Sequence, residues 1–237
     1  MLGRKIIRKL GNWCNRLFVT PIEVFVFHGV SDVFDEREYQ KIDWMSTGDF
    51  QRNIHYLLNN YTFISLPEAY SKLKKNWLRC RKYAVLTCDD GFADVLKVLP
   101  YLNEKNIPIT LFVNPKYLDG ISRREGYTEN PRYITYEELF GIQFDNVTIG
   151  FHGYEHVDVT KQSREEFRHD LQMCIDSLTH HTRYIPYYAY TWGRFNDDSQ
   201  RVLNSNGIIP VLTDGLVNYH YSNGISRRLL DANSFVM

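Results

Sequence analysis

The pattern of hydrophobic and polar residues changes repeatedly between two periods along the chain. Short apolar runs bounded by turn residues predict buried strands, and longer segments with apolar residues three or four positions apart predict helices. The predicted strands are 23–27, 83–87, 107–113, 147–150, 187–190 and 208–212. The predicted helices are 47–59, 66–74, 92–105, 164–180 and 197–205, with a short helix starting at residue 136. Strand and helix alternate, which is typical of a parallel α/β sheet or barrel.

Length, charge and cysteine content narrow the class of protein. The chain has 237 residues, 43% of them hydrophobic, and no repeat or linker-like stretch, which predicts one domain with a sizeable core. Its formal net charge is +0, whereas a nucleic-acid-binding protein would show a basic excess. The four cysteines form no C-x-x-C pair, which argues against a zinc ribbon or a disulfide scaffold. A reducing, cytoplasmic compartment is the simplest interpretation.

The N-terminal segment, residues 1–22, is basic and amphipathic. It lacks the apolar core and small-residue cleavage site of a secretory signal. We favour a helix that packs on the domain or a frayed tail. The alternative is peripheral contact with an anionic membrane surface, with four basic side chains toward the headgroups. These are Lys5, Arg8, Lys9 and Arg16.

Polar residues stand where several predicted strands end. His28 follows the first strand, the adjacent Asp89 and Asp90 follow the second, and His152 follows the strand that ends at residue 150. The carboxyl ends of parallel strands meet at one edge, where the chemistry of α/β folds gathers. Two neighbouring carboxylates repel each other, and burying them is costly unless a positive charge compensates. The alternative is a polar turn in which one aspartate caps a helix.

A pair of histidines, His152 and His156, is spaced by four residues. If the residues between them form a helical turn, both rings lie on one face and can reach one ion. Structural or incidental histidines are the alternative. Together with an aspartate from a neighbouring strand end, the pair would make three ligands and leave one position open, as in catalytic metal sites. One aspartate would then bind the metal while the other stays available as a base.

Several segments occur in the order of a known set of motifs. They are VFVFHGV (24–30), TCDDG (87–91), VLPYLNEKNIPITLFVN (98–114), IGFHGYEH (149–156) and AYTWGRFN (189–196). They resemble the motifs of the polysaccharide deacetylases, the NodB-homology carbohydrate esterases, and the first is similar to the circularly permuted poly-N-acetylglucosamine deacetylase branch. The resemblance covers about residues 23–230. It implies an α/β fold, a distorted (β/α)7-type barrel, with the catalytic domain at 23–237.

The resemblance also implies roles for individual residues. Asp90, His152 and His156 would bind one divalent metal, with zinc as first choice and cobalt, nickel or manganese as alternatives. Asp89 would be the general base for a metal-activated water that attacks an N-acetyl carbonyl. The C-terminal L-x-H motif that supplies the general acid in many members is missing here. His28 is our candidate, because the permuted branch places the acid near the N-terminus.

Aromatic and basic residues near the third and last motifs are candidates for substrate binding. Tyr190 and Trp192 would line the acetyl pocket or stack on the sugar, with core packing as the alternative. Arg194 would orient Asp89 or contact substrate, unless it is simply exposed. Arg227 and Arg228 lie in a run that resembles the family's closing strand. We expect one of these two to be structural and the other to face an anionic group.

Three positions depart from the family motifs. Cys88 replaces an aromatic residue, and we expect its side chain on the opposite face of the strand from the base. Gly153 replaces a serine or threonine, and Thr191 replaces a proline. We expect both changes to loosen the site. The candidate ligands and base are all retained, so we expect an active enzyme.

The sequence therefore predicts a metal-dependent hydrolase that removes an N-acetyl group from a cytoplasmic sugar or glycan precursor. Two alternatives stay open. One is hydrolysis of another amide C–N bond, including a cyclic one, at the same site. The other is an inert carbohydrate-binding module, which would agree with the 17 tyrosines.

Overall fold

The computed structural model describes residues 20–32, 44–75, 81–122, 124 and 132–235. The predicted N-terminal amphipathic segment falls almost entirely outside these ranges. The main sheet of the described chain has nine strands, and all its pairings are parallel. Its longer strands are β1 (Ile22–Phe27), β5 (Tyr83–Cys88), β6 (Ile109–Val113), β7 (Val147–Phe151), β8 (Tyr184–Ala189) and β9 (Ile209–Leu212). The predicted parallel α/β architecture is confirmed.

The sheet nearly closes into a barrel through the C-terminal part of the chain. The strand order is β10-β9-β8-β7-β6-β5-β1-β11, with the short β4 (Thr62–Phe63) beside β5. β10 (Ile225–Ser226) pairs with β9, whereas β11 (Arg228–Leu229) pairs with β1 at the other end of the order. Arg227 alone separates these two strands, so it lies where the two edges of the sheet approach each other. A second, two-stranded sheet joins β2 (Gly29–Val30) to β3 (Trp44–Met45).

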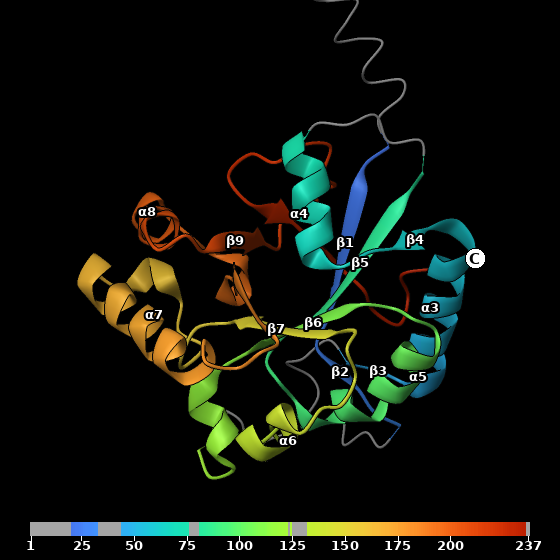
Figure 1. The fold of residues 1–237 in the computed structure, drawn as a ribbon, viewed down its shortest axis with the longest axis horizontal. Helices are drawn as coiled ribbons and strands as arrows, with labels where there is room; N and C mark the ends of the chain where they lie inside the picture. The colour runs from blue at the N-terminus through green and yellow to red at the C-terminus, as the bar shows by residue number, and fades with distance from the viewer. Residues whose placement is uncertain (1–19, 33–43, 76–80, 123, 125–131, 236–237) are drawn as a thin grey trace, which may run out of the picture.

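Two large apolar clusters make up most of the core, beside a small aromatic one of Phe92, Tyr117 and Tyr133. One contains inward residues of the strands, such as Val24, Val85 and Phe112, together with apolar residues of α4 (Leu66–Lys75). The other lies between the outer faces of the strands and the surrounding helices. Those helices are α3 (Thr47–Asn60), α5 (Leu99–Glu104), α6 (Tyr136–Phe140), α7 (Arg164–Leu178) and α8 (Asp197–Ser205). In Figure 1, α3 and α5 lie on the opposite side of the strands from α7 and α8.

The element boundaries differ from the sequence prediction at a few places. The helix predicted at 92–105 is instead a 3-10 helix, η1 (Ala93–Lys97), followed by α5. Pro100 explains the break, because it has no amide hydrogen to donate and its ring clashes with the preceding turn. Ser46 caps α3, because its hydroxyl accepts the amide hydrogen of Asp49 at 3.0 Å. No helix in the described ranges has both the length and the apolar character needed to cross a membrane.

Candidate metal centre

The strand β5 ends in a left-handed turn that carries the two adjacent carboxylates. Asp90 has φ 70° and Gly91 has φ 73°. Residues other than Gly, Asn and Asp rarely adopt this left-handed backbone conformation. A Cβ at residue 91 would lie 3.1 Å from Cγ1 of Val113, so this turn requires glycine. The next helix, η1, begins after Phe92 and has no side-chain cap. The alternative in which an aspartate of this pair merely caps a helix is therefore wrong.

The structure brings the three predicted metal ligands together. Oδ1 of Asp90 lies 3.3 Å from Nε2 of His152 and 3.0 Å from Nε2 of His156. One ligand atom from each of the three lies within 4.8 Å of the others, and all three residues are buried. Burial lowers the pKa of His156 to about 4, so this imidazole is neutral at pH 7. For Asp90, burial opposes ionisation, but the two histidines hold its pKa well below the usual value. The donor set and its protonation state fit a divalent metal.

A backbone carbonyl fixes the tautomer of His152. Its Nδ1 lies 2.9 Å from the carbonyl oxygen of Ala189, at the end of β8. A carbonyl oxygen only accepts hydrogen bonds, so Nδ1 carries the proton and donates it. The lone pair is then on Nε2, the atom that faces Asp90. Metal-binding histidines are commonly oriented in this way.

The two histidines converge without the predicted helical turn. Residues 152–156 have no regular secondary structure, with φ 76° at Gly153 and 59° at His156. Side chains from elsewhere hold this turn. Nδ2 of Asn114 donates to the carbonyl oxygens of His152 at 2.5 Å and Gly153 at 2.9 Å, and the Tyr117 hydroxyl donates to that of Glu155 at 2.9 Å.

Thr191 also contributes to the order of this region. Its buried hydroxyl donates to the carbonyl oxygen of Val157 at 2.5 Å, a bond that proline cannot make. The expectation that Thr191 relaxes the site is therefore wrong, because its hydroxyl ties the third motif to the histidine turn. The effect of Gly153 stays a prediction, although Asn114 donates to the carbonyl oxygens of residues 152 and 153.

Asp89 is held by Arg227, one of the two arginines of the predicted closing strand. Nη1 and Nη2 of Arg227 donate to Oδ1 and Oδ2 of Asp89 at 2.6 and 2.8 Å. Burial would raise the pKa of Asp89, but the charge of Arg227, with His152 and His28, outweighs it and lowers the pKa. Oδ2 of Asp89 also lies 3.9 Å from Nε2 of His152. A carboxylate that is ionised, oriented and next to three convergent ligands is suited to accept a proton.

Arg194 does not orient Asp89, and that part of the prediction is wrong. Its Nη1 lies 2.8 Å from Oδ2 of Asp158, and its side chain is 60% exposed. Asp158 in turn accepts from the amide of Thr160. The sequence did indicate that one arginine of the Arg227–Arg228 pair faces an anionic group. It did not indicate which of the two does so, or that the anionic group is Asp89.

The sequence matches a known protein family. The model described as polysaccharide deacetylase matches residues 79–211, more than half of the chain. The chain belongs to the polysaccharide deacetylase family. The matched region contains the two aspartates and both histidines of the candidate site. The resemblance noted in the sequence is confirmed.

Solved structures similar to this deacetylase share its fold at low sequence identity. IcaB from Ammonifex degensii is 20% identical, with a TM-score of 0.73 and coverage of 89% of this chain and 91% of that one. The Streptococcus pyogenes deacetylase PplD is 19% identical, with a TM-score of 0.75 and coverage of 91% and 94%. A de-N-acetylase from Aggregatibacter actinomycetemcomitans is 17% identical, with a TM-score of 0.76 and coverage of 92% and 97%. No curated protein matches the sequence significantly.

His28 lies at the end of β1, on the Asp89 side of the site. Phe27 pairs with Cys88 in the sheet, and the amide of Asp89 donates to the carbonyl oxygen of Phe27 at 3.0 Å, so His28 directly follows the strand residue bonded to Asp89. The ring is half-buried, and its Nδ1 has no hydrogen-bond partner among the described residues.

The Cys88 thiol donates a hydrogen bond to the carbonyl oxygen of His28 at 3.3 Å. Its side chain packs in the apolar cluster between the strands and the surrounding helices, on the face expected. Burial, followed by the two nearby carboxylates, raises the pKa of Cys88 well above its usual value, so the thiol is no nucleophile here.

The two aromatic candidates have different environments in this deacetylase. Tyr190 is fully buried and stacks on Phe195 with ring centroids 5.3 Å apart, so the core alternative is correct for it. Trp192 is 58% exposed, and its ring meets that of His156 edge to face at 4.8 Å. The guanidinium of Arg124 lies 5.6 Å from the Trp192 ring, and its Nη1 lies 3.4 Å from Oδ2 of Asp90. Trp192 is thus at the rim of the site, whereas Tyr190 is beneath it.

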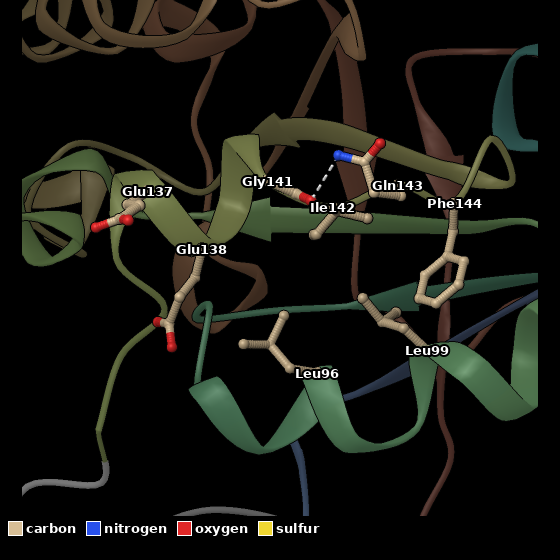
Figure 2. Close-up of a pocket in the computed structure, with 8 residues that line it drawn as sticks. All are labelled: Leu96, Leu99, Glu137, Glu138, Gly141, Ile142, Gln143 and Phe144. Carbon is tan, nitrogen blue, oxygen red and sulfur yellow. Dashed lines mark hydrogen bonds between the residues drawn. The ribbon is translucent and has the colours of Figure 1, made fainter.

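The candidate metal centre is separate from a surface groove, which is shown in Figure 2. Apolar side chains of η1, α5 and the segment after α6 line this groove, with two glutamates of α6 at its edge. They are Leu96, Leu99, Ile142, Phe144, Glu137 and Glu138. None of the candidate ligands or the base lines it, so the groove takes no part in the chemistry proposed below.

Proposed function

We propose that this deacetylase is a metal-dependent hydrolase that removes the N-acetyl group from a sugar or glycan precursor. The observation that carries the proposal is the approach of Asp90 Oδ1 to both Nε2 atoms, at 3.3 and 3.0 Å, beside an ionised Asp89. One similar structure, PplD, is described in complex with acetate, and acetate is the product that a deacetylation releases.

Asp90, His152 and His156 would hold one divalent ion. Zinc is the first choice for two imidazoles and a carboxylate, and cobalt, nickel and manganese accept the same donors. When bound, such an ion polarises the acetyl carbonyl and lowers the pKa of water toward about 7. Trp192 at the rim would lie against the sugar or the acetyl methyl group, and the exposed Arg194 remains a candidate for substrate contact.

The proton transfers would be made by two side chains. Asp89 would take the proton from the attacking water, with Arg227 fixing its orientation and keeping it ionised. His28, on the same side of the site, would give a proton to the departing amine. Each transfer by a positioned side chain typically contributes a factor of about 10²–10⁴.

The substrate would be an N-acetylated sugar linked to a nucleotide or a lipid, met in the cytoplasm. This location rests on the four scattered cysteines, which form no C-x-x-C pair and fit a reducing compartment, and the N-terminal segment is basic and amphipathic. A peripheral membrane contact by that segment would bring the enzyme to a lipid-linked precursor.

Metal analysis and one substitution test the proposal. The purified protein should hold about one ion per chain, whereas a carbohydrate-binding module need hold none. Asp89→Asn should keep the ion and abolish acetate release from N-acetylated sugars. Asp145→Asn, at a fully exposed carboxylate, is the matched control and should behave as the wild type. Near-normal turnover by Asp89→Asn would overturn the assignment of the base, and turnover of cyclic amides alone would favour the other hydrolase.

A further inference from the structure

We infer that Asp170, in the middle of α7, is a positioning residue whose carboxylate holds the turn between His152 and His156, so that both imidazoles reach Asp90. The inference rests on the proposed metal site. It assigns to Asp170 a part in building that site, without contact with the metal or the substrate.

The turn needs partners from outside itself. Because residues 152–156 form no helix or strand, their amide and carbonyl groups have no regular hydrogen-bond ladder, and buried backbone groups must be paired. Side chains of Asn114 and Tyr117 donate to carbonyl oxygens of the turn. Asp170 has the complementary role: its Oδ2 accepts the amide hydrogen of Tyr154 at 3.1 Å. Tyr154 is the central residue between the two histidines.

The absence of a side chain at Gly153 leaves room for the Tyr188 hydroxyl beside the turn, next to the Asp170 carboxylate. A Cβ at this position would lie 3.7 Å from Oδ2 of Asp170 and 3.1 Å from the hydroxyl oxygen of Tyr188. The carboxylate and the phenol therefore occupy the space beside the left-handed turn. Asp170 comes from α7 and Tyr188 from β8, so two successive elements of the chain close around this glycine.

Asp170 does not cap α7, and two other residues fill that role. The amino terminus of α7 is capped by Ser163 and Glu166, which exchange hydrogen bonds with each other's backbone. Asp170 lies further along the helix and is only 8% exposed. Among the described residues, no lysine, arginine or histidine forms an ion pair with it. Burying a carboxylate without a cation costs free energy. The hydrogen bond from the turn to Asp170 offsets part of that cost.

Metal titration of the full chain tests the inference. The ligand used is Co²⁺, added to metal-free protein and followed by its visible absorption, which reports the coordination geometry. Asp170→Ala should weaken Co²⁺ binding by about 10- to 100-fold, as is typical when a group that orients a ligand is lost, and should alter the spectrum. Asp176→Asn is the matched control, because this exposed carboxylate of the same helix bonds only Gln172 among the described residues.

Hydrogen exchange of the metal-free protein gives a readout that does not depend on the ion. Peptides that contain Tyr154 should exchange faster in Asp170→Ala than in the wild type, while peptides from β5 and β6 should not change. If Asp170→Ala does not fold, Asp170→Asn, which keeps the shape of the side chain, should still bind Co²⁺ several-fold more weakly.

Unchanged Co²⁺ affinity and unchanged exchange at Tyr154 would overturn the inference, and so would wild-type affinity in Asp170→Asn if the alanine variant is unfolded. A wild-type protein that binds no Co²⁺ would instead overturn the proposed function. In that case the exchange measurement would still decide whether Asp170 holds the turn.

Discussion

Arg227 donates one hydrogen bond to each carboxylate oxygen of Asp89, at 2.6 and 2.8 Å, and its side chain is completely buried. The two residues are 138 positions apart in the sequence, and the near closure of the barrel brings them together. The same guanidinium donates to the hydroxyls of Thr87 at 3.2 Å and Thr213 at 2.9 Å. The arginine thus joins the seam of the barrel to the proposed general base.

Removing this arginine should damage both stability and catalysis. Arg227→Gln leaves the Asp89 carboxylate buried without its cation, which typically costs about 3–5 kcal/mol. Because Arg227 lowers the pKa of Asp89, its loss should raise that pKa and move the acidic limb of the pH–rate profile to higher pH. Urea unfolding and kcat/KM as a function of pH measure the two effects. Arg201→Gln, at an exposed side chain that pairs with the exposed Asp198, should change neither by much, and an unshifted acidic limb in Arg227→Gln would contradict the prediction.

Replacing the proposed general acid should separate metal binding from turnover. His28→Gln should lower kcat by about 10²–10⁴-fold and leave the metal content unchanged, since His28 is outside the ligand set. The basic limb of the pH–rate profile should also disappear. His55→Gln is the control, because His55 is exposed on α3 and bonds Asn59. A full loss of metal in His28→Gln would show that this residue acts on the ligands and not as an acid.

A side chain at Gly153 should be more harmful than one at a comparable glycine. Gly153→Ala places a Cβ in a left-handed backbone and 3.1 Å from the Tyr188 hydroxyl oxygen. The left-handed backbone alone should lower the free energy of unfolding by about 1–2 kcal/mol, and the close contact with the Tyr188 hydroxyl should lower it further. Gly207→Ala is the matched control, because Gly207 has φ 68° but nothing within 4 Å of the added carbon. Chemical denaturation should show a larger loss of unfolding free energy for Gly153→Ala.

The contact term can be isolated with a second substitution. The Tyr188 hydroxyl is buried and has no hydrogen-bond partner among the described residues, so Tyr188→Phe alone should be close to neutral. Combined with Gly153→Ala, it should recover part of the loss in a double-mutant cycle. Strict additivity of the two changes would mean that the hydroxyl does not limit the space at residue 153.

The buried carboxylate of Asp170 predicts a pH dependence of stability. Burial raises its pKa from 3.8 to about 6, so the folded protein binds more protons than the unfolded chain between these values. The resulting contribution to stability is present below about pH 4 and is lost as the pH rises to about 6. Asp170→Asn should therefore unfold with a free energy higher by up to about 3 kcal/mol at pH 8, and the gain should shrink toward pH 4. Denaturation of the metal-free proteins at several pH values measures this, and a variant less stable than the wild type at pH 8 would contradict it.

The hydroxyl of Thr191 should matter for the histidine turn. Thr191→Val keeps the shape of the side chain but leaves the carbonyl oxygen of Val157 without this donor, which should cost about 1–3 kcal/mol. Co²⁺ affinity should also fall, because Val157 directly follows His156. Thr179→Val provides the control: its hydroxyl also bonds a carbonyl oxygen, that of Ile175, but at the exposed end of α7. Equal losses of stability in the two variants would mean that the Thr191 bond stabilises the fold no more than the exposed bond of Thr179 does, which would contradict the prediction.

Sequence reasoning located the candidate ligands because their signal is local. An apolar run that ends at Asp89, Asp90 and Gly91 identifies a strand end, and His152 ends another strand of the same parallel sheet. Parallel strands place such ends at one edge, so the convergence of these residues followed from the predicted topology. The helical turn expected between His152 and His156 was wrong, because the backbone there is bonded by Asn114, Tyr117 and Asp170, which no local pattern reveals.

The sequence by itself determined the alternation of strands and helices, the family, and the residues that stand at the strand ends, since periodicity and short motifs depend on neighbours along the chain. The tertiary structure decided that Arg227 rather than Arg194 holds Asp89, and that Tyr190 is buried while Trp192 lies at the rim. These outcomes depend on where the barrel closes and on which face of a turn each side chain occupies. Both are properties of contacts between distant segments, and so the folded chain alone specifies them.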